Sequence, residues 1–216
     1  MKSEAASRRL YLEWGCAGRP MRGETESGDQ CLVQPLPGGA LVAVMDGLGH
    51  GAAAAAAART AVAVLQDHAQ ESLVPLLNRC HDALRKTNGV VLSMASLQAA
   101  ERTLAWLGVG NVECLVLRAD RSARPAQVYL LPRGGVVGYQ LPPLRVSTLS
   151  VTAGDILFLA TDGIRNGFTE GLNLDDPPQQ IAADALARYA KDADDALVLV
   201  ARFEEVSPGM ETLHDQ

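Results

Sequence analysis

Four aspartates lie at or beside the ends of apolar segments of the sequence, and glycine accompanies the first three. They are Asp29 in Ser-Gly-Asp, Asp46 in Val-Met-Asp-Gly, Asp162 in Ala-Thr-Asp-Gly, and Asp194, which precedes Asp195 and the run Ala-Leu-Val-Leu-Val. A carboxylate at a strand end is fixed by a rigid element and still reaches solvent. Several converging carboxylates form a hard, oxygen-lined site that suits Mg²⁺ or Mn²⁺. The pattern therefore predicts a divalent metal site.

An isolated Asp-Gly pair is most often a turn, because both residues tolerate turn geometry. The combination is harder to explain in that way, since Asp46 and Asp162 each follow an apolar run and Asp194 directly precedes one. Crowded like charges are costly unless cations compensate them, and only Arg165 is close in sequence to any of the three. Two metal ions about 3.5–4 Å apart would compensate them and would suit in-line displacement at phosphorus.

The segments that position these aspartates read as strands and helices without a regular βα alternation. We therefore predict an α+β fold in which helices cover two antiparallel sheets. Residues 90–131 are expected to form an antiparallel meander, and 134–150 a Gly- and Pro-rich connection. The expected strands span residues 10–16, 31–33, 40–45, 90–97, 103–109, 112–117, 126–131, 155–160 and 196–203, and the expected helices 51–66, 73–86 and 179–190.

Length and net charge indicate how many domains to expect and which kinds of binding partner to exclude. The 216 residues predict one domain over 9–204, with tails over 1–8 and 205–216. The net charge of -6 argues against a nucleic-acid or anionic-membrane partner, because either would favour a basic patch. The charged start of the chain is unlike a secretory signal, and the alanine-rich segment 52–65 is too short and polar to span a membrane. A cytoplasmic protein is expected.

The aspartate motifs, taken in order, resemble those of a known family. Gly-Asp29, Asp46-Gly-Leu-Gly-His-Gly51, Thr-Asp162-Gly-Ile and Asp194-Asp-Ala-Leu-Val-Leu-Val are similar to the motifs of metal-dependent protein phosphatases of the PP2C (PPM) type. The compact form resembles the SpoIIE-like branch, and most of all RsbX-type phosphatases, which act on phosphorylated stress-signalling regulators. The resemblance covers roughly residues 18–203 and implies a four-layer α-β-β-α sandwich with metals in a cleft at one edge.

The same resemblance implies a role for each aspartate. Asp46 would bridge two ions, Mn²⁺ or Mg²⁺, and the Gly47 carbonyl would complete one of them. Asp162 and Asp194 would hold the other ion, and Asp29 would lie in the first or second coordination shell. A metal-bridging water would attack phosphorus directly. The implied activity is a phosphoserine/phosphothreonine protein phosphatase whose partner is a phosphorylated regulatory protein, of the stressosome or anti-anti-sigma type.

Three further residues are candidates with an ordinary alternative. His50 lies between two glycines and is either a general acid for the leaving oxygen or a plain loop histidine. Arg19 and Arg22 precede Asp29 and either approach the phosphate or are solvated loop residues. Asn111 is interpreted as a turn residue. The phosphate-gripping arginine of some eukaryotic relatives has no clear match.

Two other functions compete with the phosphatase. Gly47-x-Gly49-x-x-Ala52 follows an expected strand and opens a helix, as in dinucleotide-binding folds, with Asp67 about 20 residues further on. An aspartate directly before the first glycine would repel a pyrophosphate, and this reading leaves Asp162 without a role. The second alternative is a catalytically silent PP2C-fold module that binds a phosphoprotein partner.

Overall fold

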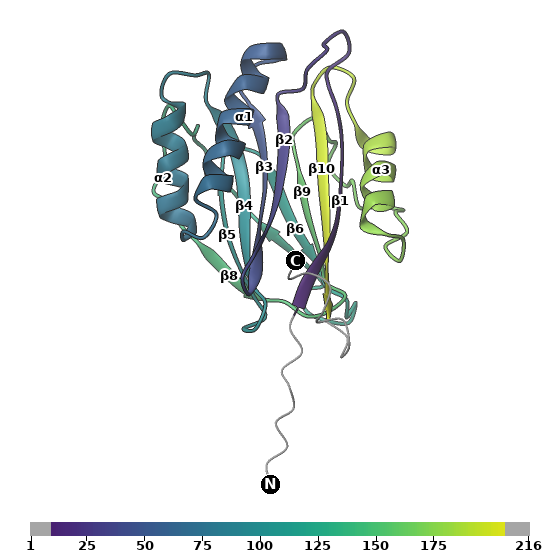
Figure 1. Ribbon diagram of the computed structural model, residues 1–216. Helices are drawn as coiled ribbons and strands as arrows, with labels where there is room; N and C mark the ends of the chain where they lie inside the picture. Colours follow the sequence, from purple (N-terminus) through teal and green to yellow (C-terminus); the bar gives the residue numbers. More distant parts are fainter. Residues whose placement is uncertain (1–9, 206–216) are drawn as a thin grey trace, which may run out of the picture.

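The computed structural model describes residues 10–205, which form two antiparallel five-stranded sheets packed face to face (Figure 1). The first sheet has the strand order β1-β10-β9-β6-β7 and the second β2-β3-β4-β5-β8. The strands are β1 Leu10–Arg19, β2 Asp29–Leu36, β3 Gly39–Gly47, β4 Val90–Gln98, β5 Thr103–Val109, β6 Glu113–Leu117, β7 Gln127–Leu130, β8 Ser147–Ser150, β9 Ile156–Ala160 and β10 Ala196–Glu205.

Three helices cover the outer faces of the sheets. Helices α1 (Gly51–Asp67) and α2 (Leu73–Leu84) lie on the second sheet, and α3 (Pro178–Tyr189) lies on the first (Figure 1). The layers follow the order helix, sheet, sheet, helix, which confirms the predicted α+β sandwich. No helix within residues 10–205 is both long enough and apolar enough to cross a membrane.

The central strands are apolar throughout because both of their faces are covered. In β3, the side chains of Leu41, Ala43 and Met45 pack with the helices, whereas Val42 and Val44 pack between the sheets. Successive side chains of a strand point to opposite faces, so burial on both faces requires an unbroken apolar run. These runs made β3, β9 and β10 recognisable from the sequence, and they hold the strand ends rigidly.

The alanine-rich helix α1 packs closely on the end of β3. A Cβ atom added at Gly47 would lie 2.2 Å from the carbonyl oxygen of Ala54, so only glycine fits there. The Gly47 amide also donates a 3.0 Å hydrogen bond to the Gly28 carbonyl. The Asp-Gly pair therefore marks a crowded strand end, which fixes the backbone beside Asp46.

Two details of the predicted topology are wrong. The strands between residues 90 and 131 do not form one meander, because β4 and β5 pair in the second sheet and β6 and β7 in the first. The chain crosses between the sheets at Gly110, whose φ of 102° favours glycine. The expected connection over 134–150 contains β8, a short edge strand that pairs with β5. Its sequence, Ser-Thr-Leu-Ser, has one apolar residue and gives no strand signal.

The final strand extends to Glu205, the first residue of the predicted C-terminal tail. The rest of that tail and the predicted N-terminal tail, 1–8, lie outside the described residues.

Candidate active site

Three of the predicted site aspartates line one open cavity of about 380 Å³ at an end of the sandwich. Asp46 lies near the end of β3 in the second sheet. Asp162 follows β9 and Asp194 precedes β10, which are neighbours in the first sheet. The cavity therefore exists only because the two sheets are packed together. The other lining residues are Met21, Leu48, Gly49, His50, Val91, Asn111 and Ala193.

The cavity carboxylates repel one another. Burial raises the pKa of Asp46 from 3.8 to about 7, and the charges of Asp162, Asp194 and Asp195 add to the increase. Burial, followed by the charge of Asp162, also raises the pKa of Asp194, while Lys191 opposes that increase. A cavity that disfavours its own negative charges in this way is ready to accept cations.

Asp29 lies beneath the cavity rather than in its wall. It is opposite Asp46 in the pairing of β2 with β3, and only 3% of it is exposed. Burial raises its pKa from 3.8 to about 8, and the charge of Asp46 adds to the effect. The Thr161 hydroxyl donates a 2.7 Å hydrogen bond to Oδ2. The other oxygen, Oδ1, is buried and has no hydrogen-bond partner within residues 10–205.

The donor set fits divalent metal ions. A buried carboxylate oxygen without a donor costs about 1–3 kcal/mol, and a cation or a cation-bound water would offset that cost at Asp29. Within residues 10–205, no three acidic, histidine or cysteine side chains surround one point closely enough to hold an ion by themselves. Each ion would therefore need carbonyl or water oxygens as well, which agrees with the several waters that Mg²⁺ retains.

Asp195 has a structural position that distinguishes it from its neighbour. It is buried and accepts 2.7 Å hydrogen bonds from the backbone amides of Met21 and Gly28. These bonds fasten the loop between β1 and β2 to the start of β10. Asp194, in contrast, lines the cavity.

The family model described as Stage II sporulation protein E (SpoIIE) matches residues 37–204, a range that includes the three cavity aspartates. The chain belongs to the SpoIIE family. Phosphoserine phosphatase RsbX of Bacillus subtilis (strain 168) is 23% identical to it over 142 residues, which cover 66% of this chain and 69% of RsbX.

Solved structures share the fold of this SpoIIE-family chain. A chain of the bacterial stressosome, described as a modular system adapted to control secondary messenger signaling, gives a TM-score of 0.81 with 30% identity, covering 88% of this chain and 99% of that chain. The structure of RsbX in complex with magnesium gives a TM-score of 0.79 with 18% identity, and the match covers 90% of this chain and 96% of that chain. The PP2C phosphatase domain of SpoIIE from Bacillus subtilis gives a TM-score of 0.77 with 21% identity, and the match covers 93% of this chain and 65% of that chain. The predicted family and enzyme class, a PP2C-type phosphatase, are confirmed.

Asn111 was interpreted from the sequence as a turn residue, but the structure places it at the cavity. Its side-chain amide donates a 2.8 Å hydrogen bond to Oδ2 of Asp162. The bond fixes the orientation of that carboxylate and leaves Oδ1 for another partner. The only sequence signal was a polar residue between two expected strands, directly before the strand predicted over 112–117.

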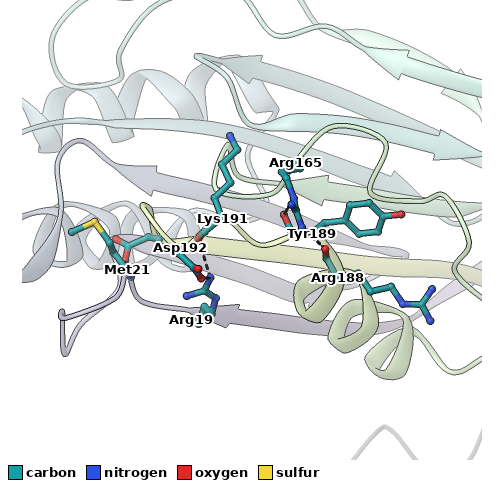
Figure 2. A network of polar contacts seen from close by, with 8 residues as sticks. Arg19, Met21, Arg165, Arg188, Tyr189, Lys191 and Asp192 are labelled. Carbon is teal, nitrogen blue, oxygen red and sulfur yellow. Dashed lines mark hydrogen bonds and ion pairs between the residues drawn. The ribbon is translucent and has the colours of Figure 1, made fainter.

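Two of the remaining candidates, His50 and Arg19, have protein partners. Nδ1 of His50 lies 2.7 Å from Oε1 of Glu24 at the exposed rim of the cavity. Arg19 donates to the Lys191 carbonyl at 2.9 Å and to Asp192 at 3.0 Å, so it holds the loop before β10 (Figure 2). Arg22 is exposed in the β1–β2 loop.

The arginine that follows Asp162 in the sequence does not neutralise the cavity carboxylates. Arg165 donates to the backbone carbonyls of Arg188 and Tyr189 at the end of α3 (Figure 2). Lys191 is the cation beside the site: its amine donates to the backbone carbonyl of Asp162, and its charge opposes the increase in the pKa of Asp194. The contact with Asp162 joins residues 29 apart and could not be predicted from the sequence.

Proposed function

We propose that this chain is a metal-dependent phosphoserine/phosphothreonine protein phosphatase that binds two divalent ions, Mn²⁺ or Mg²⁺, within a single domain over residues 9–204. The observation that carries this is the meeting of Asp46, Asp162 and Asp194 from both sheets in one cavity, above an Asp29 oxygen that has no hydrogen-bond partner among residues 10–205. The structure of RsbX with magnesium supports a divalent ion in this fold.

Each residue has a proposed task. Asp46 would bridge the two ions, and the Gly47 carbonyl would complete one of them. Asp162 and Asp194 would hold the other ion, and Asp29 would act directly or through a water. Bound in this way, the ions would supply a nucleophilic water and charge stabilisation for displacement at phosphorus. Asn111 would keep the Asp162 carboxylate oriented.

His50 is the proposed proton donor to the leaving serine or threonine oxygen. It lines the cavity at the rim, where a protein substrate would approach, and Glu24 is close enough to orient its ring. A general acid must lie within hydrogen-bond reach of the leaving atom, and this position is compatible with that requirement.

The proposed partner is a phosphorylated regulatory protein of the stressosome or anti-anti-sigma type, and the proposed location is the cytoplasm. The name of RsbX, a phosphoserine phosphatase, and the similarity to a stressosome chain support this choice. A catalytically silent module that binds the same kind of phosphoprotein is the second candidate, because an intact cavity would bind metal and phosphate in either case.

Hydrolysis of p-nitrophenyl phosphate and of a phosphoserine peptide, with Mn²⁺, with Mg²⁺ and with EDTA, tests the proposal. We expect metal-dependent turnover in the wild type and none in Asp46→Asn. Calorimetric titration of the metals separates the alternatives. Metal binding without turnover supports the silent module, and the absence of metal binding contradicts both.

A further inference from the structure

Lys191 is held beside the acidic cavity from three directions. Its backbone amide donates to the Gly163 carbonyl at 2.8 Å, and its carbonyl accepts the 2.9 Å bond from Arg19. Its side-chain amine donates to the Asp162 carbonyl. In Figure 2 the side chain extends away from the pair formed by Arg19 and Asp192. An exposed lysine is ordinarily free to move, so these contacts fix a positive charge at one place.

Among residues 10–205, the Lys191 ammonium group forms no salt bridge with a carboxylate. Within residues 10–205 its ammonium group makes one hydrogen bond, to a neutral carbonyl, and the group has three donors. Two neighbouring basic side chains already have acidic partners, since Arg19 pairs with Asp192 and His50 lies against Glu24. Lys191 is a fixed cation beside the cavity that keeps donors for a ligand, whereas Arg22 is exposed in the β1–β2 loop.

The charge balance of the loaded site calls for such a cation. Asp29, Asp46, Asp162, Asp194 and the neighbouring Asp195 carry five negative charges when ionised, and two divalent ions would cancel four of them. A phosphorylated serine or threonine brings a further charge of about -1.5 to -2. Without another positive group, the substrate would gain little from long-range attraction to the site.

We propose that the Lys191 ammonium group binds the phosphoryl oxygens of the phosphoserine or phosphothreonine substrate at the rim of the cavity. The inference rests on the proposed function and assigns to Lys191 the contact that the sequence suggested for Arg19 or Arg22. Arg19 becomes a positioning residue, because it fixes the backbone of Lys191. The ligand class is a phosphate monoester dianion or inorganic phosphate.

The test uses Lys191→Gln, which keeps a donor without the charge, and Lys191→Arg, which keeps the charge. Arg121→Gln is the control, because Arg121 is exposed in the loop that follows the far end of β6. For each protein we would measure kcat and KM on a phosphoserine peptide, the Ki of inorganic phosphate, and calorimetric phosphate binding with Mg²⁺ present.

In Lys191→Gln we expect KM for the peptide and both phosphate constants to rise together by about ten- to hundredfold, the loss expected for a hydrogen bond between charged groups. The value of kcat should change less, because the contact is present before and during the reaction. Lys191→Arg should restore most of the affinity, and the control should match the wild type.

A fall in kcat or in melting temperature with unchanged phosphate constants would overturn the inference, because Lys191 would then only brace the Asp162 turn. Turnover by the wild type with unchanged KM in Lys191→Gln overturns it as well and leaves the phosphatase assignment standing. A wild type that binds phosphate through Lys191 but does not hydrolyse the peptide supports the inference and contradicts the enzyme.

Discussion

Replacing Asp46 by asparagine should stabilise the metal-free protein while it abolishes catalysis. Burial and the neighbouring carboxylates raise the pKa of Asp46 from 3.8 to about 7. That change corresponds to roughly 4 kcal/mol of folding free energy when the group is ionised, at about 1.4 kcal/mol for each tenfold change. Part of the side chain is exposed, so solvent screening reduces the expected gain to about 2–3 kcal/mol.

The gain should depend on pH in a defined direction. Between about pH 4 and pH 7 the folded protein binds more protons at Asp46 than the unfolded chain does, so stability falls as pH rises through this window. The cost is complete above the folded pKa and small near the unfolded pKa. Asp46→Asn removes the cost, so its advantage should be largest at pH 8 and less than about 1 kcal/mol at pH 4.5.

The assay is urea and thermal unfolding in EDTA at both pH values. For a domain of this size the melting temperature should rise by about 5–10 °C at pH 8. Asp67→Asn, at the exposed end of α1, is the matched control and should change little. Equal gains in stability at both pH values, or no gain at pH 8, would refute the explanation that burial and repulsion of the Asp46 charge destabilise the metal-free protein. With Mn²⁺ the wild type should gain stability by mass action and the variant should not.

Three further outcomes are expected. Asp162→Ala should keep the circular dichroism spectrum of the wild type and lose turnover; an unfolded spectrum would make Asp162 structural. Asp195→Ala should lower the free energy of unfolding in urea by roughly 2–4 kcal/mol, because the partly buried amide of Met21 and the buried amide of Gly28 lose their acceptor; a smaller loss would mean that water replaces the carboxylate. Asn111→Ala should lower kcat about tenfold with an unchanged melting temperature, since it removes one hydrogen bond that orients Asp162; an unchanged kcat would remove Asn111 from the site.

The predictable part of the fold is the part in which local sequence is constrained on both faces. Strand β3 is buried from Ala40 to Met45, and β9 is buried along its whole length, so both runs are apolar. Asp46 directly follows the first run, and one threonine separates the second from Asp162. Burial on both faces also explains why the pairing of the strands could not be predicted from the sequence. An apolar strand gives no sign of which sheet it joins, and the switch of sheets after β5 was therefore read as a meander.

The sequence of an edge strand indicates even less clearly that a strand is present. Strand β8 has neighbours on one side only, and its residues alternate between partly buried and exposed. Such a strand needs few apolar residues, and its backbone pairing with β5 is determined by the partner. A Gly- and Pro-rich composition around it then dominated the sequence pattern, so the strand was assigned to a connection.

The residues that support the site could not be predicted from the sequence for a different reason: their contacts depend on the register between paired strands. Strands β6 and β9 pair with Glu113 opposite Ala160, and continuing the antiparallel count by two residues brings Asn111 opposite Asp162. Nothing in the local sequence of Asn111 encodes that count, since it depends on which strands are neighbours. Once the pairing is known, the contact follows from the period of two. The aspartates proposed to bind metal were visible because each belongs to a local motif. The residues that orient them are determined by topology and become visible only with the sheets assembled.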